Sequence, residues 1–570
     1  LAGAHGTQRL PRVANVEFAL KVMTSGEPVS VEAAQEAGAV DRVTTGDLIE
    51  EAVKYAEELI EAAAPRRPIQ DMTIDKGKYN EEYFAQYRES IARKTRGLNA
   101  PERSIRCVEA AVNLPFAESV LVEREMSLES HRDPQAQALQ HVFFAERQAN
   151  KVPGLAKDAT LRSINSVAVI GAGTMGGGIA MNFANVGIPV KILEMNNEAL
   201  EKGLGVIKKN YDATARKGRI SEAEVEKRMA LLTGTTDYNE LADADLVIEA
   251  VFENMEVKKE VFKTLSNTVR PETILASNTS YLNIDELASV VEKPERMLGM
   301  HFFSPANVMR LLEIVRADKT SPDVLATILR LAKAITKVGA VAGVCHGFIG
   351  NRMLSGYASQ ANRLLLEGAA PHQLDQVLYD FGMPMGVIAM ADLAGLDIGY
   401  RMRQALNETQ YDVESAYLYD NLVEMGRLGQ KTGAGVYDYE PGDRTPKPSS
   451  ITEKLLAEAA EKFNIKQREI SEEEIIERCF FSLFNVGCNI LHEGIAYRAS
   501  DIDTVYINGY GFPAWRGGPM HWAEHAVGLE KILDRIREFA DIHGDKYWKP
   551  SPLLEQLVAD GGSLQDIQNT

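Results

Sequence analysis

The sequence has few cysteines, and this shortage excludes several kinds of site. The 570 residues contain four cysteines, which lie far apart and form no CxxC pair: Cys107, Cys345, Cys479 and Cys488. Zinc sites and dithiol redox sites need closely spaced cysteines, so we predict no metal. Scattered free cysteines are typical of a reducing compartment, and the last residues, DIQNT, do not match the SKL-type peroxisomal signal. We therefore expect a cytoplasmic protein.

Long apolar runs and an excess of positive charge are also absent. No apolar run approaches the roughly 18 residues of a membrane span, and no signal-peptide pattern is present. The net charge is −19 and the pI is about 5.2, whereas nucleic-acid binding draws on clustered Lys and Arg. We expect a globular protein of roughly three or four domains, with no nucleic-acid partner and no membrane span.

Between Ser166 and about Cys345, short Val/Ile-rich runs alternate with amphipathic helical patterns. The runs are SVAVIG, PVKILE, DLVIEAVF, TILASN, MLGMHFF, LLEIV and GAVAGVC. This alternation is typical of a parallel sheet covered by helices. After Gly347 the strand patterns disappear, and helical patterns continue to the end of the chain.

The helical part contains a weak repeat. Residues 362–384 resemble residues 489–513, because each segment closes a helix on Glu-Gly and ends on an aromatic-Gly-x-Pro pattern. We therefore predict two copies of one helical unit, joined by a Gly/Pro/Ser-rich segment at 432–450. Sixteen residues before each Glu-Gly signal stand Asn351 and Glu477. The second copy thus lacks the polar position of the first, and we expect it to serve packing.

A glycine-rich turn joins the first of these strands to a helix. It contains Gly171, Gly173, Thr174, Met175 and Gly176. Alone, GxGxxG is a weak signal, but here the next strand ends in an acid, Glu194, 18 residues after Gly176. Such glycines let the backbone approach a pyrophosphate, and such an acid accepts from a ribose 2′-OH. We predict an NAD site in preference to NADP, with helix capping as the alternative role of Glu194.

The segment LGMHFFSPANVMRLLEIV supplies a candidate for proton transfer. His301 ends one apolar strand and Glu313 lies inside the next, with a Ser-Pro-Ala-Asn turn between them. A carboxylate inside LLEIV is costly to bury alone, so it needs a partner. We predict that Glu313 holds His301 as a general base; the alternative is a core histidine bonded to a backbone carbonyl.

At these residues the chain resembles the 3-hydroxyacyl-CoA dehydrogenase family. The resemblance runs from about Ser166 to beyond Tyr439 and includes GAGTMG, VIEAVFE, SNTS, GMHFFSP, GFIGN and GRLGQKTGAGVYDY. It implies oxidation of (S)-3-hydroxyacyl-CoA with NAD by His301 and Glu313. It also implies that Ser280 and Asn351 hold the substrate's 3-oxygen and the surroundings of the histidine, and that Glu253 and Lys258 line the NAD site. Ser280 could instead cap the helix expected at 283–291.

The role of Ser304 and two alternative functions remain to be considered. Many family members have Asn where this chain has Ser304, so Ser304 is not included among the catalytic residues. A β-hydroxyacid dehydrogenase with a catalytic Lys and NADP is one alternative, which Glu194 and the His301–Glu313 pair disfavour. A non-catalytic NAD- or CoA-binding relative is another.

The beginning of the chain resembles a second family. Residues 3–43, starting GAHGTQRLPR, are similar to the segment of enoyl-CoA hydratases (crotonases) that follows their active site. The resemblance implies a multifunctional fatty-acid β-oxidation enzyme whose two hydratase glutamates lie upstream of this segment, so we expect no hydratase activity from these 570 residues. An acyl-CoA substrate is implied, with a thiolase or a second copy of the chain as a possible partner.

Together these observations predict an α/β Rossmann-like NAD-binding domain followed by two all-α dehydrogenase C-terminal domains, with a helical crotonase remnant at the N-terminus. The predicted segments are a crotonase tail, a helical linker, the NAD-binding domain and two helical domains, at 1–70, 71–160, 161–345, 346–450 and 451–570.

Overall fold

The computed structural model describes residues 3–156, 158–404 and 411–569. The chain divides into two compact units, Leu1–Leu139 and Gln140–Thr570, and each is described by itself. None of the helices within the described ranges is long and apolar enough to cross a membrane.

The first unit contains only helices in its described part. They are α1 (Gly6–Val13), α2 (Val16–Ser25), α3 (Val31–Glu36), α4 (Leu48–Glu61), η1 (Ile69–Asp71), α5 (Glu81–Ile91), α6 (Ala100–Asn113) and α7 (Phe116–Arg132). Val16, Leu20 and Phe84 form a small core with Ile105 and Val108 of α6. The linker helix α6 therefore buries the apolar side of the preceding segment. In contrast, α4 has no buried residue.

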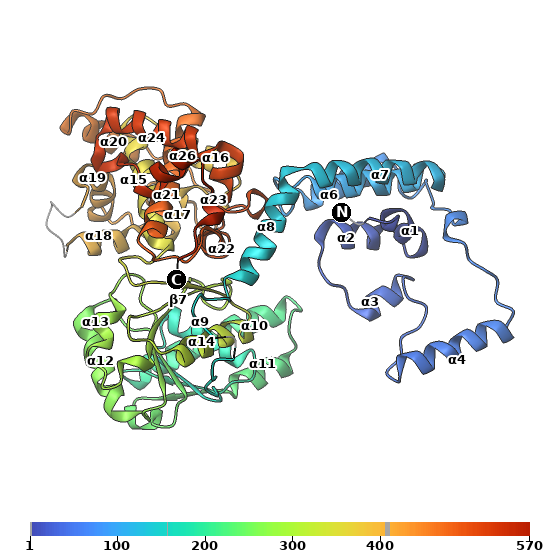
Figure 1. Cartoon of the computed structure of the whole chain (residues 1–570), viewed down its shortest axis with the longest axis horizontal. Coiled ribbons are helices and arrows are strands. Elements are labelled where there is room, and N and C mark those ends of the chain that lie inside the picture. The colour runs from blue at the N-terminus through green and yellow to red at the C-terminus, as the bar shows by residue number, and fades with distance from the viewer. Residues whose placement is uncertain (1–2, 157, 405–410, 570) are drawn as a thin grey trace. The chain divides into compact units, whose positions relative to one another are not determined.

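An eight-stranded sheet forms the base of the second unit (Figure 1). Its strands are β1 (Val167–Ile170), β2 (Val190–Leu193), β3 (Leu232–Thr235), β4 (Leu246–Glu249), β5 (Ile274–Ser277), β6 (Met297–Phe302), β7 (Leu311–Val315) and β8 (Val338–Ala342), in the spatial order 3-2-1-4-5-6-7-8. All neighbours are parallel except β6 and β7. Seven strands coincide with the seven predicted runs. The eighth, β3, is an edge strand of sequence LTGT with two exposed residues, so it lacks the apolar pattern that marks the others.

Helices cover both faces of this sheet. They are α9 (Thr174–Ala184), α10 (Asn197–Arg216), α11 (Glu222–Met229), α12 (Met255–Thr268), α13 (Ile284–Ala288) and α14 (Pro322–Ala334). Because side chains alternate along a strand, Leu312 and Ile314 of β7 pack in the core that contains α9 and α14. Leu311 and Val315 pack in the other core, which contains the helical part of the unit. Glu313 shares the face of Leu311 and Val315.

The rest of the second unit is helical. It includes the end of α8 (Pro134–Gln148), then α15 (Gly350–Leu366), α16 (Pro371–Phe381), α17 (Val387–Ala394), α18 (Leu396–Gln404), α19 (Val413–Glu424), α20 (Ser450–Lys462), α21 (Glu472–His492), α22 (Ala499–Gly509), α23 (Pro519–Trp522), α24 (Leu529–His543), α25 (Asp545–Trp548) and α26 (Pro552–Asp560). The repeat predicted from sequence corresponds to the pairs α15–α16 and α21–α22. Both α15 and α21 end on a Glu with φ −81° and ψ −4°.

The two long repeat helices, α15 and α21, pack against each other in opposite directions. Arg352 at the start of α15 forms two hydrogen bonds of 2.6 Å with Glu493 at the end of α21. Arg478 at the start of α21 pairs in the same way with Glu367 at the end of α15, at 2.6 and 2.9 Å. The Glu-Gly signal of each copy therefore supplies the carboxylate that binds the other copy.

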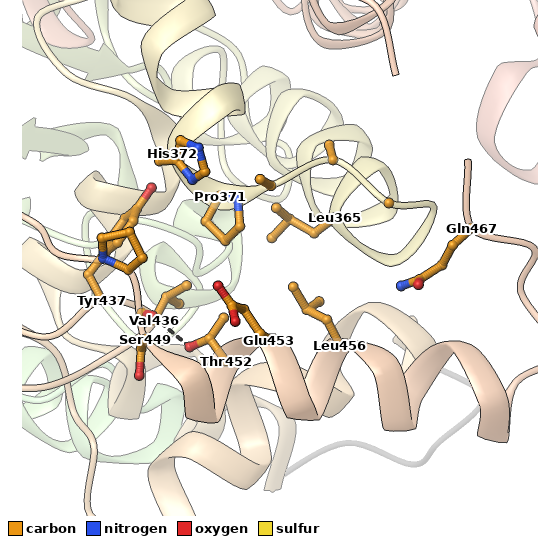
Figure 2. Close-up of a pocket in the computed structure, with 14 residues that line it drawn as sticks. Leu365, Pro371, His372, Val436, Tyr437, Ser449, Thr452, Glu453, Leu456 and Gln467 are labelled. Carbon is orange, nitrogen blue, oxygen red and sulfur yellow. Dashed lines mark hydrogen bonds between the residues drawn. The ribbon is translucent and has the colours of Figure 1, made fainter. Parts of the chain in front are cut away.

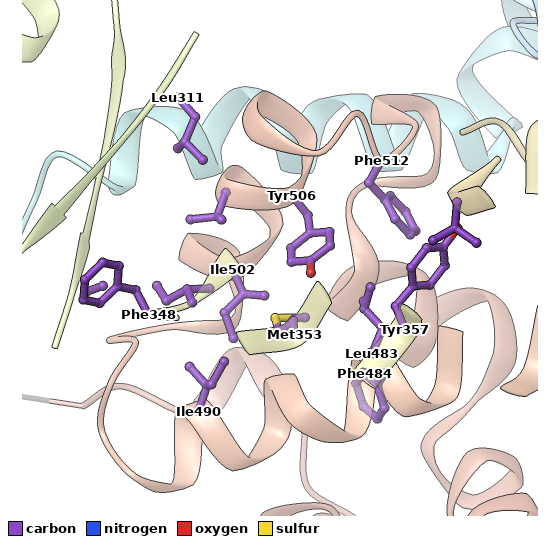
Figure 3. Packing of buried hydrophobic residues seen from close by; sticks show 14 of the residues in the cluster. Leu311, Phe348, Met353, Tyr357, Leu483, Phe484, Ile490, Ile502, Tyr506 and Phe512 are labelled. Carbon is purple, nitrogen blue, oxygen red and sulfur yellow. The ribbon is translucent and has the colours of Figure 1, made fainter. Parts of the chain in front are cut away.

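Apolar side chains fill the space between the sheet and these helices (Figure 3). Leu311 from β7, Met353 from α15, Phe484 from α21 and Ile502 from α22 belong to one continuous core. Their burial fixes the start of α15 against the ends of β6 and β7, which is where His301 and Glu313 lie.

Candidate active site

The glycine-rich turn leaves an open cradle at the start of α9. A Cβ on Gly176 would lie 1.9 Å from the Gly171 carbonyl oxygen, and one on Gly171, where φ is +100°, would lie 2.8 Å from the Ala250 carbonyl oxygen. By contrast, a Cβ on Gly173 would meet no atom within 4 Å. Thr174 and Met175 begin α9, whose first backbone amides have no partner within the helix. The turn therefore combines close backbone packing with free space at a positive helix end, which suits a pyrophosphate.

Glu194 follows β2 at the same edge of the sheet. Its backbone amide donates to the Thr235 carbonyl at 3.1 Å. The side chain that caps α10 is that of Asn196, which accepts from the Ala199 amide. Glu194 is therefore not the helix cap that the alternative interpretation required, and within the described residues its carboxylate has no hydrogen bond or ion pair.

His301 and Glu313 lie directly opposite each other in the antiparallel pair β6–β7. The His301 Nδ1 atom is 2.8 Å from Glu313 Oε2, and both residues are buried. A carboxylate at Nδ1 fixes the tautomer in which Nδ1 carries the proton, so Nε2 presents a lone pair. The predicted pairing is present, and the alternative of a histidine bonded to a backbone carbonyl is not what the structure shows.

Glu313 also joins the sheet to the helical part. Its second oxygen, Oε1, accepts from the backbone amides of Ile349 and Gly350, each at 3.1 Å. These amides lie at the first turn of α15, where a helix favours negative charge. The cost of burying Glu313 is thus offset by the imidazole on one side and a helix end on the other.

An ion cluster around the buried Lys258 shapes the loop that carries Ser280. Lys258 has no exposed surface and donates to Glu249 Oε1 at 2.8 Å, and its ammonium lies 3.2 Å from Glu253 Oε2. Glu253 Oε1 accepts from the backbone amides of Ser280 and Tyr281 at 2.8 and 3.1 Å. Burial raises the pKa of the Glu253 carboxyl, but Lys258 and these hydrogen bonds outweigh it, and the pKa lies below its usual value. The ammonium of Lys258 thus contacts Glu249 and Glu253, and no contact with the glycine-rich turn at 171–176 is found among the described residues.

Ser280 itself is half-buried and does not cap a helix. The cap of α13 is Asn283, which accepts from the amides of Asp285 and Glu286. Asn278, in the same SNTS motif, accepts from the Phe302 amide at 2.9 Å and so holds the end of β6 beside this loop. The Ser280 carbonyl lies 3.4 Å from Asn351 Nδ2. Ser280 and Asn351 are therefore neighbours, as the resemblance implied.

Tyr510, which follows α22 in the second copy, is the residue of this site that the sequence does not reveal. Its hydroxyl donates to Asn351 Oδ1 at 2.8 Å. Because burial raises the pKa of Tyr510 well above its ordinary value, the phenol keeps its proton and remains a donor. This bond sets the Asn351 amide so that Nδ2 faces Ser280. Tyr510 also packs edge-on against Phe303, whose ring centroid lies 4.3 Å from that of His301.

Two other features in the helical part lie apart from these residues. A pocket of about 190 Å³ between the α15–α16 turn and α20 is lined by Leu365, His372, Tyr437 and Thr452, among others, and by none of the predicted site residues (Figure 2). The motif GRLGQKTGAGVYDY is held by buried Asp392, which accepts from the amides of Val436 and Tyr437 at 2.8 and 2.9 Å. Its role in the described structure is to fasten this loop to α17.

Comparison with protein families matches the same regions. The model for the 3-hydroxyacyl-CoA dehydrogenase NAD-binding domain matches residues 166–345. The model for the 3-hydroxyacyl-CoA dehydrogenase C-terminal domain matches residues 347–439 and again 475–565. The predicted fold class is confirmed, including the duplication of the helical domain, and the cofactor of the family's nucleotide-binding domain is NAD.

Curated relatives match almost the whole chain. The peroxisomal bifunctional enzyme of Danio rerio is 41% identical over 579 residues, covering 98% of this chain and 80% of the relative. The human peroxisomal bifunctional enzyme is 39% identical with the same coverage. A peroxisomal fatty acid beta-oxidation multifunctional protein of Arabidopsis thaliana is 33% identical over 580 residues, covering 100% of this chain and 80% of the relative.

Solved structures with the same fold carry related names. A 3-hydroxybutyryl-CoA dehydrogenase from Escherichia coli superposes with a TM-score of 0.61 at 28% identity, covering 70% of this chain and all of that one. The dehydrogenase part of multifunctional enzyme 1 from C. elegans superposes with a TM-score of 0.55 at 27% identity, covering 73% of this chain and 96% of that one.

One prediction is wrong. We expected a cytoplasmic protein, but the relatives are named peroxisomal or glyoxysomal, which points to the peroxisome. The error has a physical reason: free cysteines indicate a reducing compartment without distinguishing one such compartment from another, and a targeting signal is a short receptor-read segment that is independent of the fold.

The family matches, the relatives and the site geometry agree. The two dehydrogenase family models cover the sheet and both helical copies, the relatives cover the rest of the chain, and the His301–Glu313 pair lies beside the nucleotide cradle's end of the sheet. The chain belongs to the 3-hydroxyacyl-CoA dehydrogenase family, among the multifunctional enzymes of fatty-acid β-oxidation.

Proposed function

We propose that His301 is the general base with which this chain oxidises the 3-hydroxyl group of an (S)-3-hydroxyacyl-CoA, and that Glu313 orients and stabilises it. The observation that carries the proposal is the 2.8 Å bond between Nδ1 and the buried carboxylate. With Nδ1 protonated, Nε2 accepts the proton of the substrate hydroxyl. Bound NAD supplies the hydride acceptor, so the products are the 3-oxoacyl-CoA, NADH and one proton.

Glu313 acts on both charge states of the imidazole. A carboxylate at Nδ1 stabilises the imidazolium that forms as the proton arrives. In the reverse direction the same imidazolium returns the proton to the 3-oxo oxygen. The backbone amides of Ile349 and Gly350 hold the Glu313 carboxylate in place during both steps, because they donate to its other oxygen.

We assign the substrate's 3-oxygen to Ser280 and Asn351. The hydroxyl of Ser280 forms no hydrogen bond with another described residue, and the Asn351 amide is oriented by Tyr510. Two neutral donors at the 3-oxygen would favour the charge that develops there during hydride transfer. Tyr510 is a positioning residue, since it acts through Asn351.

We assign NAD to the cradle formed by Gly171, Gly173, Thr174, Met175 and Gly176. The carboxylate of Glu194 would accept from the ribose 2′-hydroxyl and repel a 2′-phosphate. We assign Glu253 and Lys258 to the lining of the same NAD site, and Glu253 also holds the loop that carries Ser280. The fit rests on the open space at Gly173 and on the unpaired carboxylate of Glu194.

The structure supports the two alternative functions, a catalytic-lysine dehydrogenase and a non-catalytic relative, less well. A catalytic-lysine mechanism would need an accessible amine beside the cradle, whereas Lys258 is fully buried between two carboxylates. A non-catalytic relative has no need for a histidine held by a buried acid. A thiolase or a second copy of this chain as partner stays a prediction.

The test is NADH consumption with acetoacetyl-CoA by wild type, His301→Ala and Glu313→Gln. We expect His301→Ala to lower kcat by about 10²–10⁴-fold, the range that a general base supplies, and Glu313→Gln to lower it less. The control His131→Ala, at an exposed histidine of α7, should retain full activity. If His301→Ala binds NADH normally and retains the wild-type kcat, His301 is not the base.

A further inference from the structure

We propose that a groove between α8 and α14, separate from the active site, binds the phosphates of an adenine nucleotide such as the nucleotide end of coenzyme A. We call it the α8–α14 groove. Its walls are the end of α8, parts of residues 150–156 and 159–161, Arg310, the second half of α14 and the start of β8, and its volume is about 950 Å³. The choice of coenzyme A rests on the proposed function, whereas the choice of a phosphorylated nucleotide rests on the lining.

The groove lies on the other face of the sheet from the catalytic pair. Leu329 of α14 packs with Leu312 and Ile314, whose side chains point away from the face that carries Glu313. The residues of the groove and those of the active site are also different sets. A ligand in the groove would therefore leave His301 and the NAD cradle free.

The lining is strongly cationic in a chain whose net charge is −19. It contains one carboxylate, Glu146, and six cationic side chains: Arg147, Lys151, Arg310, Arg330, Lys333 and Lys337. A concave surface with one sign of charge concentrates ligands of the other sign. This positive charge is local to the groove, whereas the net charge of the whole chain would repel an anion.

Of these six cationic side chains, Arg310 alone has an acidic partner in the described structure. Glu146 is shared between Arg310 at 3.4 Å and the Asn508 amide at 3.0 Å. In the described structure, Lys151, Arg330 and Lys333 form no ion pair. A second pocket, of about 480 Å³ and also beside α14, differs in this respect: there Arg162 pairs with Asp323 at 2.7 Å and Arg270 with Asp245 at 2.8 Å.

Lys337 adds a buried ammonium to the lining. It is 7% exposed, and its Nζ donates to the carbonyl oxygens of Ala306 and Met309 at 2.7 and 2.6 Å. No carboxylate pairs with it in the described structure, and burial lowers its pKa to about 8. An anion in the groove would favour its charged form.

The remaining lining suits a flat, partly apolar group. Phe143 is 50% exposed, and the Arg147 guanidinium lies 3.5 Å from its ring centroid. Leu155, Leu161 and Leu329 supply further apolar surface. Aromatic and Arg planes stack on nucleobases, while Arg and Lys bind phosphates, so the combination favours a nucleotide over a simple anion.

The wall formed by α8 is held in place. His141 binds Asp503 at 2.8 Å, and Arg498 donates to the carbonyl oxygens of Gln148 and Lys151. These contacts fix the end of α8 and Lys151, three residues beyond it, to the second helical copy. The groove is therefore preformed, which lowers the entropic cost of binding, and its volume falls within the usual range for ligand pockets.

The experiment is calorimetric titration of the full chain with adenosine 3′,5′-bisphosphate, in saturating NADH so that the dinucleotide cradle is filled. The groove variant is Arg330→Glu with Lys333→Glu. The matched control is Lys202→Glu with Lys209→Glu, which makes the same charge change at exposed positions of α10. We expect the groove variant to bind about tenfold more weakly or worse, since two attractive charges become repulsive, and the control to bind like wild type.

Equal binding by wild type, groove variant and control would overturn the proposal, as would an absence of binding to wild type. Inorganic pyrophosphate completes the test. If pyrophosphate binds as tightly as the bisphosphate, the site recognises charge alone and the nucleotide assignment is wrong. Turnover of acetoacetyl-CoA is measured in parallel, because a chain that binds the nucleotide but lacks turnover would contradict the proposed function and leave the groove standing.

Discussion

The two helical copies share a backbone plan and differ in what they contribute to the chemistry. α15 and α21 end in the same conformation on Glu-Gly, and each copy's Glu binds the other copy's Arg. Yet Asn351 of the first copy faces Ser280, while its counterpart Glu477 binds Arg535 at 2.8 Å. The two copies thus share the interface, whereas their equivalent polar positions have different partners.

The equivalent aromatic residues of the two copies, Tyr510 and Phe381, also make different contacts with the other copy. In the second copy, the aromatic-Gly-x-Pro signal places Tyr510 against Asn351 of the first. In the first copy, the same signal places Phe381 against Phe480 of the second, with ring centroids 4.1 Å apart. One aromatic position therefore orients a polar side chain, and the other fills a core. The second copy therefore packs against the first and also orients Asn351, so our expectation that it serves packing describes only part of its contribution.

The largest effect is expected when the arginine is removed from the buried one of the two Arg–Glu pairs between α15 and α21. Arg478 has no exposed surface, and Glu367 is 9% exposed. Arg478→Met leaves Glu367 buried without its main partner, so we expect a loss of about 3–5 kcal/mol in the free energy of unfolding. Urea denaturation measures it.

The matched variant is Arg352→Met in the equivalent pair, whose side chains are 25% and 44% exposed. Water replaces the lost partner there, and we expect a loss of about 1 kcal/mol or less. Equal losses for the two variants would show that burial does not distinguish the pairs.

The second comparison separates catalysis from packing at the equivalent positions Asn351 and Glu477. Asn351→Ala removes a donor at the proposed 3-oxygen site, so we expect kcat with acetoacetyl-CoA to fall by about 10²-fold. Glu477→Ala removes the partner of Arg535 and should leave kcat unchanged, with a loss of about 1 kcal/mol in stability. If kcat falls to the same extent in both variants, the second copy has kept a catalytic role at Glu477.

The smallest effect is expected for the two aromatic positions. Tyr510→Phe keeps the ring and removes the hydroxyl that orients Asn351, so we expect kcat to fall by about tenfold, equivalent to the 1.4 kcal/mol of one hydrogen bond. The KM for acetoacetyl-CoA should change little, because the tyrosine does not touch substrate.

Phe381→Leu is the matched variant in the first copy. It should lower the thermal unfolding midpoint and leave kcat at the wild-type value, since in the described structure Phe381 packs in the core and contacts none of the proposed site residues. A Tyr510→Phe enzyme with unchanged kcat would remove Tyr510 from the positioning role.

Local patterns were sufficient to predict most of the fold and the centre of the site. Strand alternation marks seven of eight strands, and the short connection between β6 and β7 places Glu313 opposite His301. The strand β3 was not predicted, because its sequence LTGT is short and lacks an apolar pattern. The role of Tyr510 was not predicted, because its partner Asn351 lies 159 residues away in the sequence. No local pattern encodes a contact between two repeats.

The burial of Lys258 also could not be predicted. Its place in an amphipathic helix indicates an exposed charge, and only the convergence of Glu249 and Glu253 on it explains why it is enclosed. The three side chains lie between residues 249 and 258, so the cluster depends on how the turn after β4 folds the start of α12 back onto the end of the strand.

The reciprocal Arg–Glu pairs of α15 and α21 have a consequence for how the enzyme behaves on dilution. Two identical subunits joined by such an interface would separate as their concentration falls, and each would then lose whatever the other supplied. Here both halves lie on one chain, so the second copy stays at a high effective concentration near the first. The bond from Tyr510 to Asn351 lies within one chain, so we expect it to be independent of the enzyme concentration.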